Sequence, residues 1–130
     1  MVSLLLERGA DINTTSGDFG TALGCAAVEG NMEIVSLLLE RGADINTIGG
    51  DFGTALGCAA SKGNVELVSL LLERGTDINV IGGDYGTALG CAAVRERVKS
   101  ISLLLDRGAD INIIGGDFGL PWVVLQHRDV

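Results

Sequence analysis

Apolar residues follow two alternating patterns along this chain, and both are typical of helices. In residues 34–41, five of the eight positions are Ile, Val or Leu, which form a broad stripe on one side of a helix before a polar Glu-Arg pair. In residues 55–61 the side chains are mostly small, and Thr54 before them is a favourable helix N-cap. The pattern therefore predicts a short helix of small residues and a longer, leucine-rich helix.

Glycine and asparagine mark the boundaries of these helices. Gly42 follows the longer helix, where glycine adopts the left-handed C-terminal cap without strain. Gly63 and Asn64 separate the short helix from the next longer one. Residues 43–53 are rich in glycine and turn formers, which predicts an extended excursion with a tight turn. Each unit is thus a loop, a short helix, a turn and a longer helix.

The same unit recurs at an offset of 33 residues. Residues 50–60 reappear at 17–27 and at 83–93, with Tyr85 in place of Phe52, and an incomplete copy begins at 116. We predict repeats at about 17–49, 50–82 and 83–115, with partial repeats at 1–16 and 116–130. Helix pairs are expected at about 21–41, 54–74 and 87–107. One such unit cannot bury its apolar faces alone, so stacking predicts an all-α solenoid that forms a single domain, 1–130.

Two regions depart from the repeat. The chain begins in a longer helix without its short partner and ends in a short-helix equivalent at about 120–127. Neither end resembles the polar cap that solenoids need, which predicts a piece of a longer array or end-to-end contacts. In the third copy, Glu96 and Arg97 replace Gly-Asn, and Ser100 replaces an apolar residue. We expect an altered turn and weaker packing there, beside the basic cluster of Arg95, Arg97 and Lys99.

Charge and cysteine content narrow the range of functions. The net charge of -8 argues against nucleic acid and anionic membrane surfaces as partners, and is compatible with a basic one. Cys25, Cys58 and Cys91 occupy one position per repeat, where we expect buried, unpaired thiols. Stacked helices lie about 8–10 Å apart, too far for a disulfide, so a cytosolic or nuclear location is expected. No secretion signal or apolar run of membrane-spanning length is visible.

The repeated motif resembles the ankyrin repeat over about residues 1–119. The resemblance is carried by Gly-x-Thr-Ala-Leu-x-x-Ala-Ala, the Gly-Asn turn, Glu-Ile-Val-Ser-Leu-Leu-Leu-Glu-Arg-Gly-Ala-Asp-Ile-Asn and the 33-residue period. The loop variant is similar to arrays common in fungal proteins, where a nucleotide-binding signalling domain often precedes them. The resemblance implies an L-shaped stack whose loop tips and short helices line a concave, protein-binding face without catalysis.

One difference from the family concerns a histidine that braces neighbouring loops. The family's Thr-Pro-Leu-His is Thr-Ala-Leu-Gly at 21–24, 54–57 and 87–90 in this chain. Glycine in a first helical turn costs about 0.5–1 kcal/mol relative to alanine. The sequence therefore predicts an array that is less stable than a typical member of the family, and it predicts that a triple Gly→His variant is more stable than the native chain.

Several motifs that suggest chemistry are better explained by the repeat. Asp-Phe-Gly at 18–20, 51–53 and 117–119 matches a kinase triplet, but the other kinase motifs are absent. One Asp per repeat cannot supply the six to eight oxygens that calcium needs, and the loops lack phosphate-binding motifs. A Ser-His-Asp or Cys-His site would depend on His127, the only histidine. We therefore predict no enzyme activity, no catalytic residues, no metal site and no cofactor.

The loops also carry paired ladders of acidic and aromatic residues. One interpretation is structural, with each ring packing on the next loop and each aspartate closing a turn. The other is an interaction stripe for a partner with a basic or apolar surface, because aromatic residues are frequent interface hot spots. On that interpretation the candidate protein-binding residues are Asp18, Phe19, Asp51, Phe52, Asp84, Tyr85, Asp117 and Phe118.

The alternative function is a structural or self-associating segment of a larger array that stacks through uncapped ends. A second aspartate ladder, at Asp11, Asp44, Asp77 and Asp110, is interpreted as loop structure. The copies differ most at 14–16, 28–29 and 94–99, where any specificity for individual partners is expected.

Overall fold

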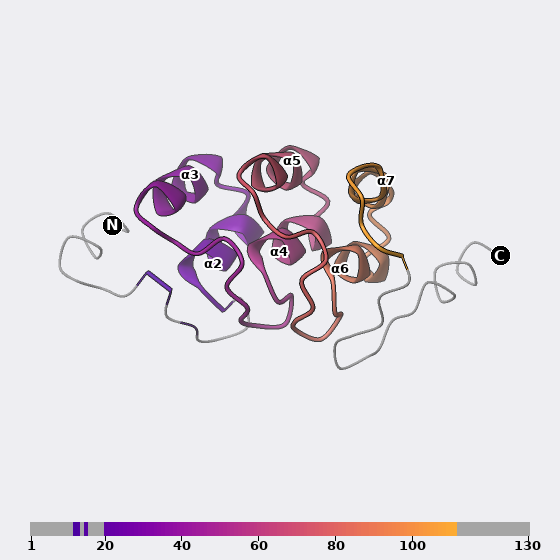
Figure 1. The fold of residues 1–130 in the computed structure, drawn as a ribbon, viewed down its shortest axis with the longest axis horizontal. Helices are drawn as coiled ribbons and strands as arrows, with labels where there is room; N and C mark the ends of the chain where they lie inside the picture. Colours follow the sequence, from indigo (N-terminus) through magenta and orange to yellow (C-terminus); the bar gives the residue numbers. More distant parts are fainter. Residues whose placement is uncertain (1–11, 14, 16–19, 112–130) are drawn as a thin grey trace.

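The computed structural model describes residues 12, 13, 15 and 20–111, and these residues form two layers of helices (Figure 1). The short helices α2 (Ala22–Glu29), α4 (Ala55–Ser61) and α6 (Ala88–Val94) lie side by side in one layer. The longer helices α3 (Met32–Glu40), α5 (Val65–Glu73) and α7 (Val98–Asp106) lie in the other. The predicted all-α solenoid of helix pairs is confirmed. The helices expected near 1–8 and 120–127 lie outside the described residues.

Threonine side chains start the short helices, as the sequence predicts. The hydroxyls of Thr21, Thr54 and Thr87 accept hydrogen bonds from backbone N–H groups three residues later, at 3.0, 3.2 and 3.2 Å. Each bond satisfies one of the N–H groups that a helix leaves without an internal partner at its first turn. The start of each short helix is therefore encoded locally.

Asparagine and glycine bound the longer helices in the same way. The side-chain oxygens of Asn31 and Asn64 accept from the N–H groups at the third position of α3 and α5, both at 3.1 Å. After the three longer helices, Gly42, Gly75 and Gly108 have positive φ angles of 95°, 91° and 97°. This backbone conformation favours glycine, so the predicted helix stops are confirmed.

The core lies between the two layers and between neighbouring repeats. Leu38, Leu71 and Leu104, at the same position of each longer helix, have no exposed surface. Helix α4 packs against both α2 and α6, and its Ala59 and Ala60 are also fully buried. Small side chains on the short helices allow this close approach, since repeats can stack only as tightly as their facing side chains permit.

An asparagine ladder links the loops of successive repeats. The side-chain oxygen of Asn46 accepts hydrogen bonds from the backbone N–H of Asp77 at 2.9 Å and from the Thr76 hydroxyl at 3.2 Å. Asn13 and Asn79 repeat the first bond with Asp44 and Asp110, at 2.8 and 2.9 Å. The sequence predicts these asparagines only as turn formers, because their partners lie 31 residues further along the chain.

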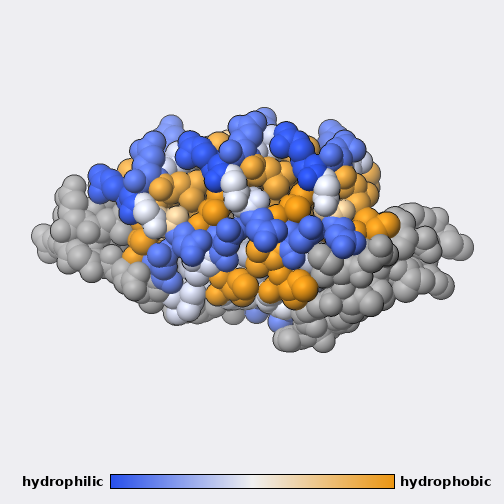
Figure 2. Space-filling model, viewed as in Figure 1, coloured by the Kyte–Doolittle hydropathy of each residue, from blue (hydrophilic) through white to orange (hydrophobic). Residues whose placement is uncertain are grey.

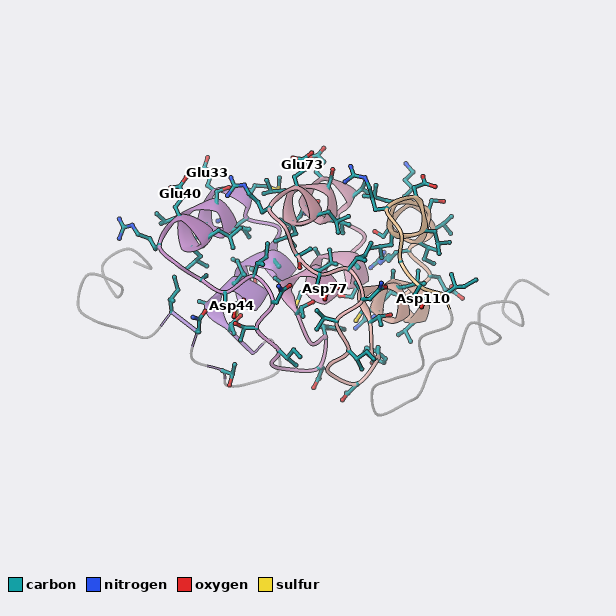
Figure 3. The ribbon with its side chains drawn as sticks, in the orientation of Figure 1. Glu33, Glu40, Asp44, Glu73, Asp77 and Asp110 are labelled. Atoms are coloured by element: carbon teal, nitrogen blue, oxygen red, sulfur yellow. The ribbon has the colours of Figure 1, made fainter. Side chains whose placement is uncertain are left out.

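Asp44 and Asp77 of the second ladder have the structural role expected of them, and Asp11 lies outside the described residues. The carboxylates of Asp44 and Asp77 accept hydrogen bonds from the backbone N–H two residues later, at 2.9 and 3.0 Å. Such bonds close a turn locally. Asp44, Asp77 and Asp110 form a row across the array (Figure 3), and the side chains of Asp44 and Asp77 hold the loop in the shape that presents its N–H to the preceding asparagine.

The glycines that replace the family's histidine have a structural purpose that sequence reasoning missed. A Cβ atom on Gly57 would overlap the carbonyl oxygen of Phe52, and one on Gly90 would overlap that of Tyr85. The loops before α4 and α6 thus fold directly onto the helix backbone. A histidine at either position cannot enter without moving the loop, so the structure predicts that Gly→His destabilises the array, the opposite of the expectation from the sequence.

The turn between α6 and α7 is not altered, contrary to the expectation for the third copy. Glu96 has a φ of 57°, close to the 71° of Gly30 and Gly63 at the same place. Its N–H donates to the carbonyl three residues earlier at 3.0 Å, as the N–H of Gly63 does. The packed helices on either side impose this conformation, although it costs a residue with a side chain about 1–2 kcal/mol. What the third copy lacks is the hydrogen bond that caps the longer helix at its N-terminus, because the side chain of Arg97 forms no such bond.

Candidate interaction surface

The loops between the helix pairs project beyond the short-helix layer (Figure 1), and two candidate pairs lie in them. Asp51 is exposed, whereas Phe52, Asp84 and Tyr85 are half-buried. The backbone N–H of Asp84 donates to the backbone carbonyl of Asp51 at 2.7 Å, which ties one loop to the next. The other candidates, Asp18, Phe19, Asp117 and Phe118, lie outside the described residues.

The two described rings pack within the array. Phe52 and Tyr85 are stacked, with ring centroids 5.9 Å apart and planes at 29°. The guanidinium carbon of Arg95 lies 5.8 Å from the centroid of Phe52, within cation–π distance. Phe52 also contacts the core cluster. The rings of this pair therefore pack within the array, and Asp51 is the exposed member of the ladder among the described residues.

Two exposed isoleucines lie in the same loops and were missed by sequence reasoning. Ile48 and Ile81 are 50% and 49% exposed. A Cβ on Gly82 would meet the Ile48 side chain, so Ile48 leans across the backbone of the next loop. The signal in the sequence was a large apolar residue beside Gly-Gly, at a loop position where burial is unusual.

Hydrophobic and acidic surface therefore lie next to each other on this side of the molecule. Figure 2 shows hydrophobic surface among the loops and a hydrophilic row above it, and Asp44, Asp77 and Asp110 occupy the middle of the same view in Figure 3. We call the exposed loop residues Ile48, Asp51 and Ile81 the loop-tip surface. Isolated exposed apolar residues are ordinary, but a repeated pair beside a row of carboxylates forms a patterned surface.

The cysteines do not share one environment. Cys58 and Cys91 are buried, but Cys25 is exposed, which corrects the expectation that all three are buried. Cys91 faces the preceding repeat, where its Sγ donates to the carbonyl of Phe52 at 3.5 Å. Among the described residues no helix lies on that side of α2, so Cys25 has nothing equivalent to cover it.

Burial suppresses the nucleophilic form of the two covered thiols. It raises the pKa of Cys58 to about 12, with a further rise from neighbouring Cys25. Burial also raises the pKa of Cys91 well above its usual range. A thiol is reactive as its thiolate, so both are small hydrophobic core residues at neutral pH.

The described residues hold neither a metal-binding cluster nor a membrane-spanning helix. Within 12–13, 15 and 20–111, no three or more His, Cys, Asp or Glu side chains are placed to hold a metal ion. In that part of the chain, no helix has the length and apolar character that a membrane crossing requires. The arrangement instead offers a repeated surface held in register by hydrogen bonds between loops.

Comparison with known families agrees with the repeat seen in the sequence and structure. A sequence model described as "Ankyrin repeats (many copies)" matches residues 1–39, 25–72 and 59–105. These overlapping matches cover most of the chain and all of the described helices except the end of α7. No curated protein matches the chain as a close relative.

Proposed function

Because the chain belongs to the ankyrin-repeat family, we propose that it is a non-catalytic module that binds a protein through its loop tips and short-helix side. Ankyrin repeats are generally protein–protein interaction modules, and the family is typically non-catalytic. A fungal-type array is part of the same hypothesis, resting on the Gly-Gly-Asp-Phe/Tyr-Gly loop.

The observation that carries the proposal is the coupling of successive loops. Asn46 bonds to the backbone N–H of Asp77 at 2.9 Å, and Asp84 bonds to the backbone of Asp51 at 2.7 Å. The stack of Phe52 on Tyr85 adds a side-chain contact between the same two loops. Loops held in this way lose little conformational freedom on binding, and such preorganisation improves affinity.

The chemistry of the surface favours a basic or apolar partner. The exposed carboxylate of Asp51 lies in the same loop as Ile48, and the chain as a whole carries a net charge of -8. Complementary charge speeds association and selects partners, while buried apolar contacts supply affinity. We propose contact by the acidic-aromatic candidates named above, extended by Ile48 and Ile81.

Replacing one charged and one apolar side chain of the loop-tip surface tests the proposal. The double variant Asp51→Lys, Ile48→Ser changes two exposed side chains, and it spares Phe52, whose ring supports the fold. The matched control is Glu40→Lys, an exposed change of the same charge in the other layer (Figure 3). Partners captured from lysate of the source cells are compared by quantitative mass spectrometry, with folding checked by circular dichroism.

We expect a partner that the native chain and the control retain and the double variant loses. Equal capture by all three chains would refute the loop-tip surface as the contact. Loss with both variants would also refute it, because the effect would then follow net charge rather than position.

The asparagine ladder favours a second candidate, in which the chain is a segment that stacks on further repeats. The hydrogen bond between Asn13 and Asp44 recurs between Asn46 and Asp77 and again between Asn79 and Asp110, across the described array. The same geometry suits a contact between repeat ends. Sedimentation velocity over a hundredfold concentration range tests it, and a constant monomer mass would oppose self-association.

A reducing compartment, the cytoplasm or nucleus, is the location we propose for the chain. The three cysteines are free thiols, and two of them are buried. Unpaired thiols persist where the cell keeps them reduced. Fluorescence microscopy of the tagged protein in its source cells tests this, and a secreted product would refute it.

A further inference from the structure

We propose that the N-terminus of α7 binds a phosphate monoester, in a cavity between the α4–α5 and α6–α7 turns. The cavity has a volume of about 290 Å³. It is lined by Lys62, Gly63, Glu96, Arg97, Val98, Lys99 and Ser100. The proposed site is separate from the loop-tip surface and does not depend on the function proposed for that surface.

The first observation is a missing cap. In α3 and α5 an asparagine oxygen accepts from the N–H of the third helical residue, at 3.1 Å in both cases. In α7 the corresponding N–H belongs to Ser100, and the residue at the cap position, Arg97, provides no side-chain bond. An uncapped helix N-terminus with its N–H donors and partial positive charge favours an anion.

The second observation is independent of the helix end. Ser100 has no solvent-exposed surface, and its hydroxyl has no hydrogen-bond partner. It is the most deeply buried residue of the cavity lining. A buried hydroxyl without a partner costs about 1–3 kcal/mol, whereas the equivalent residues Ile34 and Leu67 are apolar. The Ser100 hydroxyl therefore lacks a partner and its N–H lacks a side-chain cap, and a bound oxyanion would provide both.

The third observation is the charge of the lining. Lys62, Arg97 and Lys99 line the cavity together with one acidic residue, Glu96, so the lining has a net charge of about +2 by side-chain count. The rest of the chain is strongly acidic, with a total of -8. The Nε of Arg97 donates to the carbonyl of Ser61 at 2.9 Å, which holds the Arg97 side chain over Gly63 at the side of the cavity.

The number of donors favours phosphate over carboxylate. Ser100 offers two donors, and Lys62 and Lys99 add two ammonium groups on long, exposed side chains. A phosphate monoester has three terminal oxygens and nearly two negative charges at neutral pH, against two oxygens and one charge for a carboxylate. Because Ser100 has no exposed surface, binding requires the exposed side chains of the lining to move outward as the anion enters.

Phosphate titration with three variants tests the site. Binding of inorganic phosphate is followed through the amide resonances of Ser100 and its neighbours by NMR, at constant ionic strength set with chloride. Ser100→Ala removes one donor and should weaken binding about tenfold, the effect of one charge-assisted hydrogen bond. Ser102→Ala, an exposed serine on the same helix, is the matched control and should bind like the native chain.

Arg97→Asn separates binding from folding. It restores the asparagine cap of α3 and α5 and gives up the hydrogen bond from Arg97 to Ser61, so the protein should stay folded while the cap occupies the N–H that phosphate needs. We expect an unchanged circular dichroism spectrum with binding lost. Equal phosphate shifts in the native chain, Ser100→Ala and Arg97→Asn would overturn the proposal, as would shifts that chloride alone reproduces.

A phosphoserine peptide and its unphosphorylated form identify the source of the anion. Saturable binding of the phosphopeptide that Ser100→Ala weakens would assign the site to phosphorylated protein segments. Saturation by inorganic phosphate alone would assign it to the free anion. Absence of binding with both probes would refute the site.

Discussion

Replacing Gly57 by alanine tests how the loop and the short helix fit together, because two physical effects predict opposite signs. Gly57 lies in the first turns of α4, where alanine is preferred over glycine by about 0.5–1 kcal/mol through backbone entropy. From helix propensity alone, Gly57→Ala should stabilise the protein. The structure predicts the reverse, because the new Cβ would overlap the carbonyl oxygen of Phe52.

The size of the effect follows from the bonds that hold that carbonyl. The Phe52 oxygen accepts from the Thr54 N–H at 3.0 Å and from the Cys91 Sγ at 3.5 Å, and the Phe52 ring stacks on Tyr85. Moving the loop to admit a methyl group disturbs all three contacts. Overpacking of this kind costs about 1–3 kcal/mol, so after the propensity gain of about 0.5–1 kcal/mol we expect a net loss of about 1 kcal/mol, and at most about 2.5 kcal/mol.

Urea unfolding followed by circular dichroism measures the change in unfolding free energy. Gly75→Ala is a useful comparison, because Gly75 has a φ of 91° and a Cβ added to it would meet no atom within 4 Å, so only backbone strain applies. Gly75→Asn should recover part of that loss, since asparagine tolerates the left-handed conformation. Gly57→Asn should be no better than Gly57→Ala. A Gly57→Ala variant as stable as the native chain, or more stable, would refute the steric argument.

The remaining predictions concern the loop ladder, the buried thiols and the third turn. Asn46→Ala removes the acceptor for two hydrogen bonds and should lower the unfolding free energy, measured by urea unfolding, by about 1–3 kcal/mol. Ser36→Ala, which changes a serine on α3, is the control. At pH 8 a thiol reagent should label Cys25 rapidly in the native chain, and label Cys58 and Cys91 only at the rate of unfolding. Burial raises the pKa of both Cys58 and Cys91, so these thiols lose their protons at lower pH in the unfolded chain than in the folded one. The unfolding free energy should therefore fall as pH rises from 9.0 towards about 12 for Cys58, by up to about 1.4 kcal/mol per pH unit per thiol. An unfolding free energy that stays constant over this pH range would contradict the reasoning. Glu96→Gly should stabilise the protein by about 1 kcal/mol by relieving its left-handed backbone, and a lower melting temperature would contradict that reasoning.

The sequence by itself determined the helices and the repeat. Thr54 and Asn64 cap the helices that follow them, and Ala55–Ser61 is helical over the residues predicted. These features could be predicted because each depends on residues three or four positions apart, and because a 33-residue period has one natural outcome, the stacking of units. The all-α solenoid and the family followed from the same local patterns.

The tertiary structure alone decided what individual side chains do within that array. Asn46 bonds to a loop 31 residues away, and Cys25 is exposed although the matching Cys58 is buried, because burial depends on the neighbouring repeat. Gly57 is required by the loop that folds over it, and Glu96 keeps a glycine-like turn because the helices around it are packed. Each outcome depends on contacts whose geometry no local pattern encodes. The loop-tip surface and the α7 cavity became visible only once those contacts were in place.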